Sequence, residues 1–97
     1  MIPKERRQDA ALEIFLEQQP TLRDEIQVLS AKEQHEQALW ALEDAAQEQG
    51  LEPWELILQL IATSAEELQA MRLEVHQEVA EALGMDWDEY RQLNALD

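Results

Sequence analysis

The sequence predicts an all-α protein, a compact bundle of five to six helices in a single domain spanning residues 1–97. Apolar residues recur every three to four positions in each segment, and no segment alternates apolar and polar residues with period 2. The two glycines and three prolines fall near the ends of these segments, which indicates short connections. Two Ser-x-x-Glu patterns mark helix starts. A chain of 97 residues can bury one modest core.

The first two helices are expected on either side of Pro20. Residues 4–19 form the first, with an apolar side made of Ala11, Leu12, Phe15 and Leu16. Pro20 ends it, because proline lacks the backbone N–H that a helix interior needs. Thr21 is then expected to cap a short second helix, which carries Leu22, Ile26 and Leu29.

Capping signals define the other four helices. Ser30 with Glu33 and Ser64 with Glu67 open the third and fifth helices as capping boxes. These helices end at Gly50 and Gly84, the usual left-handed stops. Pro53 suits the first turn of the fourth helix, and Asp86 caps a short sixth. The fourth helix, read from WELILQLIA, is apolar nearly all round and is expected at the centre of the core.

The two glycine corners repeat one pattern. An alanine, a glycine four residues later and an apolar residue six further on form the sets Ala46–Gly50–Leu56 and Ala80–Gly84–Tyr90. The second has the spacing of a DNA-reading helix-turn-helix, but such readers need Lys and Arg toward phosphate. Here acidic residues follow, and Arg91 is the only basic residue of the last helix. We interpret both corners as structural, whether by duplication or by the same solution reached twice.

The net charge of −15 lies in the last three-quarters of the chain. Up to Arg23, four basic residues balance four acidic ones, whereas 18 acidic residues face three basic ones from Asp24 onward. Such a field repels nucleic acid and anionic membranes and attracts basic protein surfaces. The alternative is that the acidity only keeps a small protein soluble.

Several classes of function are not expected. The chain has no cysteine, and His35 and His76 lack the spacing of di-iron or zinc ligands, so we expect no metal and no cofactor. We interpret both histidines as core or boundary residues. The serines occupy capping positions, and no phosphate-binding loop or nucleophile motif appears, so we expect no enzyme. Acidic residues interrupt the N-terminal apolar residues, and no apolar run approaches bilayer length, which indicates a soluble cytoplasmic protein.

Trp40 is the strongest candidate for a partner contact. It lies nearly opposite the apolar side of the third helix, with Glu36 and Asp44 one turn away on either side. An indole among carboxylates is either buried under another helix or exposed as an interface anchor. The sequence leaves both alternatives open.

The fifth helix carries a stripe of carboxylates, Glu67, Glu74, Glu78 and Glu81. Like charges one turn apart repel by a few tenths of a kcal/mol each, as an order of magnitude. The stripe is either a solvated face or a row that imitates DNA phosphates. The opposite side, with Leu68, Met71, Val75, Val79, Ala82 and Leu83, is expected to face the core.

These observations favour a non-enzymatic acidic module that binds a basic protein surface, or itself as a homodimer, through Trp40 and the acidic faces. The alternative is a DNA mimic that occupies the nucleic-acid groove of a basic protein. No direct nucleic-acid or membrane binding is expected.

Two blocks of the sequence resemble a known group. Both the stretch from Trp54 to Tyr90 and an N-terminal block resemble small bacterial proteins classified only as a domain of unknown function. The N-terminal block runs from Arg7 through Ala11, Phe15-Leu16 and Pro20 to Leu22. The resemblance implies a bacterial cytoplasmic protein of this length. It carries over no activity and no site residue.

Overall fold

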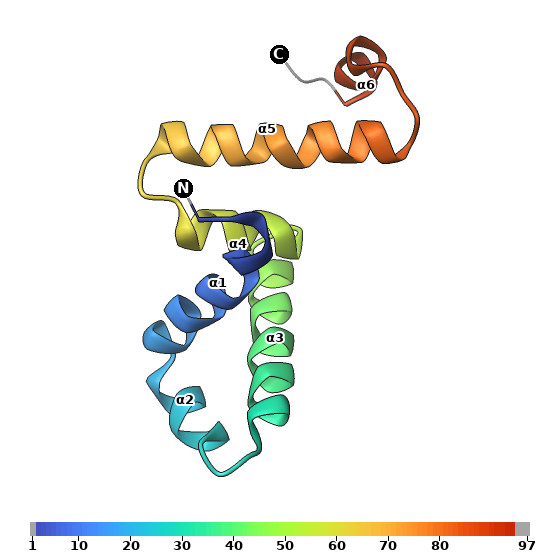
Figure 1. Ribbon diagram of the computed structural model, residues 1–97. Coiled ribbons are helices and arrows are strands. Elements are labelled where there is room, and N and C mark those ends of the chain that lie inside the picture. The colour runs from blue at the N-terminus through green and yellow to red at the C-terminus, as the bar shows by residue number, and fades with distance from the viewer. Residues whose placement is uncertain (1, 95–97) are drawn as a thin grey trace. The chain divides into compact units, whose positions relative to one another are not determined.

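The structure, a computed structural model, describes residues 2–94 and is all-α over that range (Figure 1). This confirms the predicted fold class and the upper of the two predicted helix numbers. The six helices are α1 (Lys4–Gln18), α2 (Pro20–Ile26), α3 (Ala31–Glu48), α4 (Pro53–Ile61), α5 (Ala65–Ala82) and α6 (Trp87–Leu93).

Contacts between Cα atoms group the chain into two compact units, one up to Thr63 and one from Ser64. The first unit holds α1 to α4, and the second holds α5 and α6. That the chain forms one domain stays a prediction.

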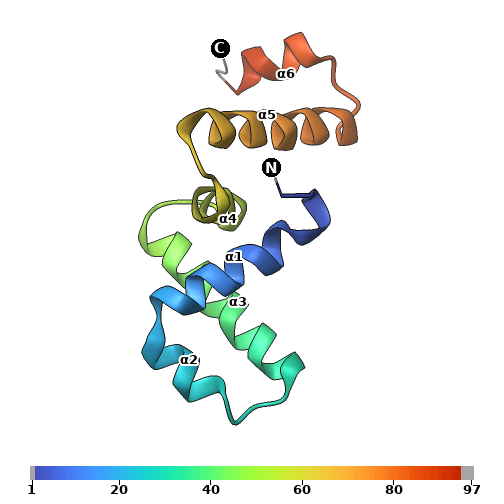
Figure 2. The same ribbon diagram turned by 60° about the vertical axis from the view of Figure 1, so that its left-hand side comes forward.

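The core of the first unit lies where α1, α3 and α4 meet. Figures 1 and 2 show α1 crossing α3 and α4, with α2 joining α1 to α3 at the end of this unit away from α4. The buried apolar side chains are Ala11, Leu12 and Phe15 of α1, Ile26 of α2, Ala38, Leu42 and Ala46 of α3, and Leu56, Leu58 and Ile61 of α4. α4 contacts both α1 and α3 and therefore belongs to the core, but α1 is more central, because it contacts α2, α3 and α4.

The break between α1 and α2 differs from the prediction at one point. Pro20 does end α1, because a residue before proline is displaced from helical geometry, and Gln19 has φ −125° and ψ 67°. However, Pro20 itself is the first residue of α2, with Gln19 in the capping position. Proline fits there because the first helical N–H has no partner in any case. The prediction that Thr21 caps α2 is therefore wrong.

The helix starts at Ser30 and Ser64 are confirmed. The backbone N–H of Glu33 donates to Ser30 Oγ at 3.2 Å, and that of Glu67 donates to Ser64 Oγ at 3.0 Å. Ser30 Oγ also donates to the Glu33 carboxylate at 2.9 Å. The serines therefore serve as helix caps, as the sequence predicts.

Both glycine corners are Schellman motifs, which explains the repeated pattern. Gly50 and Gly84 have φ of 72° and 68°. The N–H of Leu51 donates to the carbonyl of Ala46 at 2.8 Å, and the N–H of Met85 donates to that of Ala80 at 2.9 Å. The alanines are buried, so the repeat combines a helix stop with a close helix contact. The capping serines Ser30 and Ser64 are also 34 residues apart, as the two glycines are. The repeated pattern therefore extends over the whole length of α3 and α5.

The second unit is organised around Tyr90 of α6, which is buried. Its hydroxyl lies 2.9 Å from Nδ1 of His76 on α5, and its ring stacks on that of Trp87 with centroids 5.7 Å apart. His76 is half-buried, as expected for a boundary residue.

The predicted core side of α5 is only partly correct. Met71 is buried and Leu68 and Val75 are half-buried. However, Ala82 is exposed, Leu83 is 63% exposed and Val79 is 40% exposed. The reason is that, within this unit, α5 is covered by the short α6 of seven residues, and Leu83 lies at the C-cap, beyond the last helical residue.

Candidate functional site

Trp40 lies on the exposed side of α3. A helix advances about 100° per residue, so Trp40 points away from Ala38, Leu42 and Ala46, which α3 buries. The indole side chain is 56% exposed. Of burial and exposure, the structure shows exposure, so Trp40 is a surface residue. Its role as an interface anchor stays a prediction.

Acidic residues surround this indole. Glu36 precedes it by one turn and is half-buried, whereas Asp44 follows it by one turn and is exposed. Exposed Glu33 and Glu43 lie on the same side of the helix. We call this surface, made of Glu33, Glu36, Trp40, Glu43 and Asp44, the Trp40 face. It offers one large apolar group to a partner inside a ring of negative charge.

The carboxylates predicted on α5 differ in their accessibility. Glu78 and Glu81 are exposed, but Glu67 and Glu74 are half-buried. Glu67, Glu74 and Glu78 each take part in a further interaction. The stripe is therefore less uniform than the spacing suggested. It belongs to the second unit, whereas Trp40, Glu36 and Asp44 share one helix of the first.

The two histidines have different surroundings. His76 contacts Tyr90, as described above. His35 was expected to be a core or boundary residue, but it is exposed, because its helix position falls at the edge of the contact with α1. No group of three or more His, Asp or Glu side chains in residues 2–94 is arranged to hold a metal ion.

A groove of about 360 Å³ separates parts of α1 and α3, and we call it the α1–α3 groove. Leu12 and Leu16 of α1 and Ala38 of α3 form its apolar floor. Asp9 and Glu13 line its α1 side. Its α3 side is lined by Ala31, Gln34 and His35. The groove thus combines an apolar surface with two carboxylates on one rim.

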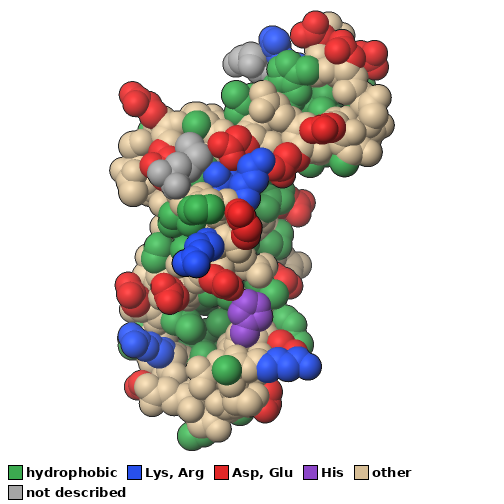
Figure 3. All heavy atoms as spheres, in the orientation of Figure 1, with side chains coloured by type: hydrophobic (Ala, Val, Ile, Leu, Met, Phe, Trp, Pro, Cys, Tyr) green, Lys and Arg blue, Asp and Glu red, His purple; other side chains and the backbone are tan. Residues whose placement is uncertain are grey.

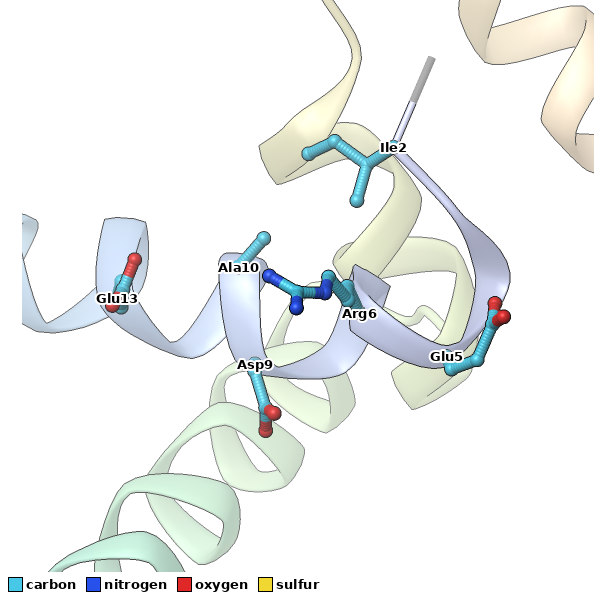
Figure 4. Close-up of a pocket in the computed structure, with 6 residues that line it drawn as sticks. All are labelled: Ile2, Glu5, Arg6, Asp9, Ala10 and Glu13. Atoms are coloured by element: carbon cyan, nitrogen blue, oxygen red, sulfur yellow. The ribbon is translucent and has the colours of Figure 1, made fainter.

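A larger hollow, of about 630 Å³, lies along the first turns of α1 (Figure 4). It is lined by Ile2, Glu5, Arg6, Asp9, Ala10 and Glu13. Figure 4 shows the three carboxylates at separate points along the helix rather than converging on one position. Such an arrangement offers a charged surface but no enclosed site for a small ligand.

The sequence reasoning missed the acidic row on α1. Glu5, Asp9, Glu13 and Glu17 follow one another at intervals of four residues, and all four are exposed. They were counted only as charges that balance the N-terminal basic residues. The four-residue interval was the signal, because it places neighbours on one side of a helix.

Acidic side chains are prominent on the face of the molecule drawn in Figure 3, with fewer basic ones between them. Within residues 2–94, none of the helices combines the length and the apolar character that crossing a bilayer requires.

Comparisons with curated proteins and with solved structures gave no match. A family model matches residues 1–96, a range that includes both blocks on which the resemblance was based. The chain therefore belongs to DUF6388, a family of unknown function.

Proposed function

We propose that this protein is a non-enzymatic acidic interaction module that binds a basic protein surface through the Trp40 face. The observation that carries the proposal is the 56% exposure of Trp40 at the centre of an acidic helix face. The bacterial cytoplasm is the setting that we propose for this binding.

Trp40 supplies the anchor of the proposed interface. A tryptophan buries a large area while losing little conformational entropy, and interface energies concentrate in such residues. An arginine of the partner can also stack on the indole and attract its π face. Exposing this apolar side chain to water is unfavourable, and a partner that covers it removes this free-energy cost.

The carboxylates supply orientation and association rate. A net charge of −15 attracts a basic protein over distance, and the acidic residues beside Trp40 then select Lys and Arg over acidic groups. In this proposal Glu67, Glu74, Glu78 and Glu81 of α5 add to the same attraction. Because exposed ion pairs contribute little individually, the tryptophan dominates the affinity.

The DNA-mimic alternative assigns the binding free energy to other residues. It requires the α5 stripe to carry the binding and predicts that DNA competes for the partner. The half-buried state of Glu67 and Glu74 favours the Trp40 face over that stripe.

Self-association through the Trp40 face is the other alternative. Two copies would bring the same carboxylates together, and the repulsion would favour monomers at low salt. Sedimentation equilibrium at low and high salt separates the two cases. A dimer that forms at low salt and is lost in Trp40→Ala would replace the basic partner by a second copy.

The test is capture of partners from a bacterial lysate by the tagged protein. Three baits are compared: the native chain, Trp40→Ala and Val28→Ala. Val28 is the control, because it is 89% exposed and lies in the connection between α2 and α3, outside the Trp40 face. We expect Trp40→Ala to lower the affinity for the captured partner at least about tenfold, within the range for interface anchors. We expect Val28→Ala to leave it unchanged.

A second comparison addresses the charges. Glu74→Gln/Glu78→Gln/Glu81→Gln is set against the control Asp24→Asn/Glu25→Gln/Glu48→Gln, which removes three acidic charges elsewhere. If the α5 variant abolishes binding, DNA elutes the partner and Trp40→Ala has no effect, the protein is a DNA mimic and the Trp40 proposal is wrong.

A further inference from the structure

We propose that the α1–α3 groove is a second docking site, for a basic segment of the partner protein. One Lys or Arg side chain lies with its aliphatic part on Leu12, Leu16 and Ala38 and its charge between Asp9 and Glu13. This inference rests on the proposed function, because it takes the same basic partner. It adds a separate surface, on the side of α3 opposite Trp40.

The floor of the groove is apolar and belongs to the core. Leu12 is 5% exposed and Ala38 is 1% exposed, so both are fixed by packing, while half-buried Leu16 extends the floor outward. The volume of about 360 Å³ falls in the range of binding pockets, roughly 300–1,000 Å³. Long cationic side chains cover such surfaces with their methylene groups while their charged ends stay in water.

The rim supplies the complementary charge. Asp9 and Glu13 are four residues apart on α1, which places their Cβ atoms about 5–6 Å from each other. Both are exposed, and within residues 2–94 neither carboxylate takes part in a hydrogen bond or ion pair. A cation between the two carboxylates is attracted by each of them and offsets the repulsion between them. The α3 rim, with Gln34 and His35, has no negative charge.

The acidic row indicates a chain rather than a single small amine. Glu5 and Glu17 continue the row beyond both ends of the groove, at the same four-residue interval. One exposed carboxylate holds a free amine weakly, whereas a segment with several basic residues can use successive positions of the row. The occupant is therefore a protein segment rich in Lys or Arg.

Nuclear magnetic resonance titration tests the groove with defined probes. The probes are octalysine and an octamer of 2,4-diaminobutyrate, which has the same number of amines on shorter stems. The methyl groups of Leu12, Leu16 and Ala38 report on the groove, and the indole N–H of Trp40 reports on the Trp40 face. We expect octalysine to shift the groove methyls and to bind about threefold tighter than the shorter probe, because two more methylenes per side chain reach the floor.

Charge variants provide the second measurement. Asp9→Asn/Glu13→Gln is expected to weaken octalysine binding about fivefold at low salt, the range for two exposed ion pairs. The control Asp24→Asn/Glu25→Gln likewise removes one Asp and one Glu charge, but from α2. It is expected to weaken octalysine binding less than twofold. Melting curves of both variants establish that each is folded.

The outcomes separate the two proposals. If the groove methyls stay unmoved, or the two double variants weaken binding equally, the groove is not a docking site. If in that case the Trp40 indole still shifts, the Trp40 face stands. Shifts confined to the groove would instead support the docking site and contradict the role of Trp40. Equal affinity for the two octamers would reduce the groove to a non-specific charge effect and overturn the inference.

Discussion

Trp40 is exposed although it lies on the same helix as buried residues. The same helix buries Leu42, two residues later, completely, because 200° of rotation carries that side chain to the opposite side. An apolar side chain therefore has very different energetic consequences at positions 40 and 42. We expect removal of Trp40 to cost little stability, whereas truncating Leu42 would leave a cavity in the core.

The glycine corners allow a test of backbone strain without steric overlap. At Gly50 and Gly84 an added Cβ would meet nothing within 4 Å, yet φ is 72° and 68°. We expect Gly50→Ala to lower the free energy of unfolding by about 1–2 kcal/mol, the cost of the left-handed conformation for an L-residue. Gly50→Asn should cost less, because asparagine tolerates that region. Urea denaturation measures both, and equal losses would contradict the strain argument.

The contact between Tyr90 and His76 is expected to stabilise the second unit. Tyr90→Phe keeps the ring on Trp87 but removes the hydroxyl that lies 2.9 Å from His76 Nδ1. We expect a loss of about 1 kcal/mol of stability. The double variant with His76→Ala should lose less than the two single losses combined, because both remove one interaction. Strict additivity in denaturation experiments would mean that the hydrogen bond contributes nothing.

At the scale of elements, the helix ends are built from local signals. A capping serine begins both long helices, and a Schellman glycine terminates both. These devices act within six residues, which is why they are readable from the sequence. Pro20 is the exception, since a proline both ends one helix and begins the next, and Thr21 beside it resembles a cap.

The caps predict a measurable loss of helix stability. Ser30→Ala and Ser64→Ala should each cost about 1 kcal/mol, because the N–H of Glu33 or Glu67 loses its acceptor. The replacements Ser30→Asp and Ser64→Asp preserve an acceptor and should keep most of that stability. Circular dichroism during thermal unfolding gives the comparison, and alanine variants as stable as the aspartate variants would contradict the capping role.

At the scale of the whole molecule, 22 acidic residues against seven Lys and Arg make repulsion a general cost of folding. Raising the ionic strength from about 0.01 M to 0.1 M shortens the screening length from about 30 Å to about 10 Å. We expect the melting temperature to rise by roughly 4–8 °C, the equivalent of about 1 kcal/mol. The variant Asp24→Asn/Glu25→Gln/Glu48→Gln should respond less to salt. A melting temperature that stays constant would show that the charges are paired more fully than their number implies.

The sequence by itself determined the all-α class, the five or six helices, the two serine caps and the glycine corners. Each of these depends on hydrogen bonds and backbone geometry within one or two turns, which a sequence records directly. The acidic character also follows from composition alone. The sequence equally placed Trp40, Glu36 and Asp44 on one side of a helix, because helical spacing is fixed.

The tertiary structure decided which of those sides meets water. Exposure of Trp40 and His35, and the partial exposure of the apolar side of α5, depend on which helices pack together and how far each contact extends. The α1–α3 groove is made by residues of two helices at least 15 positions apart, and no local pattern specifies how those helices cross. Burial is a property of pairs of elements, and this is the physical reason that it emerged only from the folded chain.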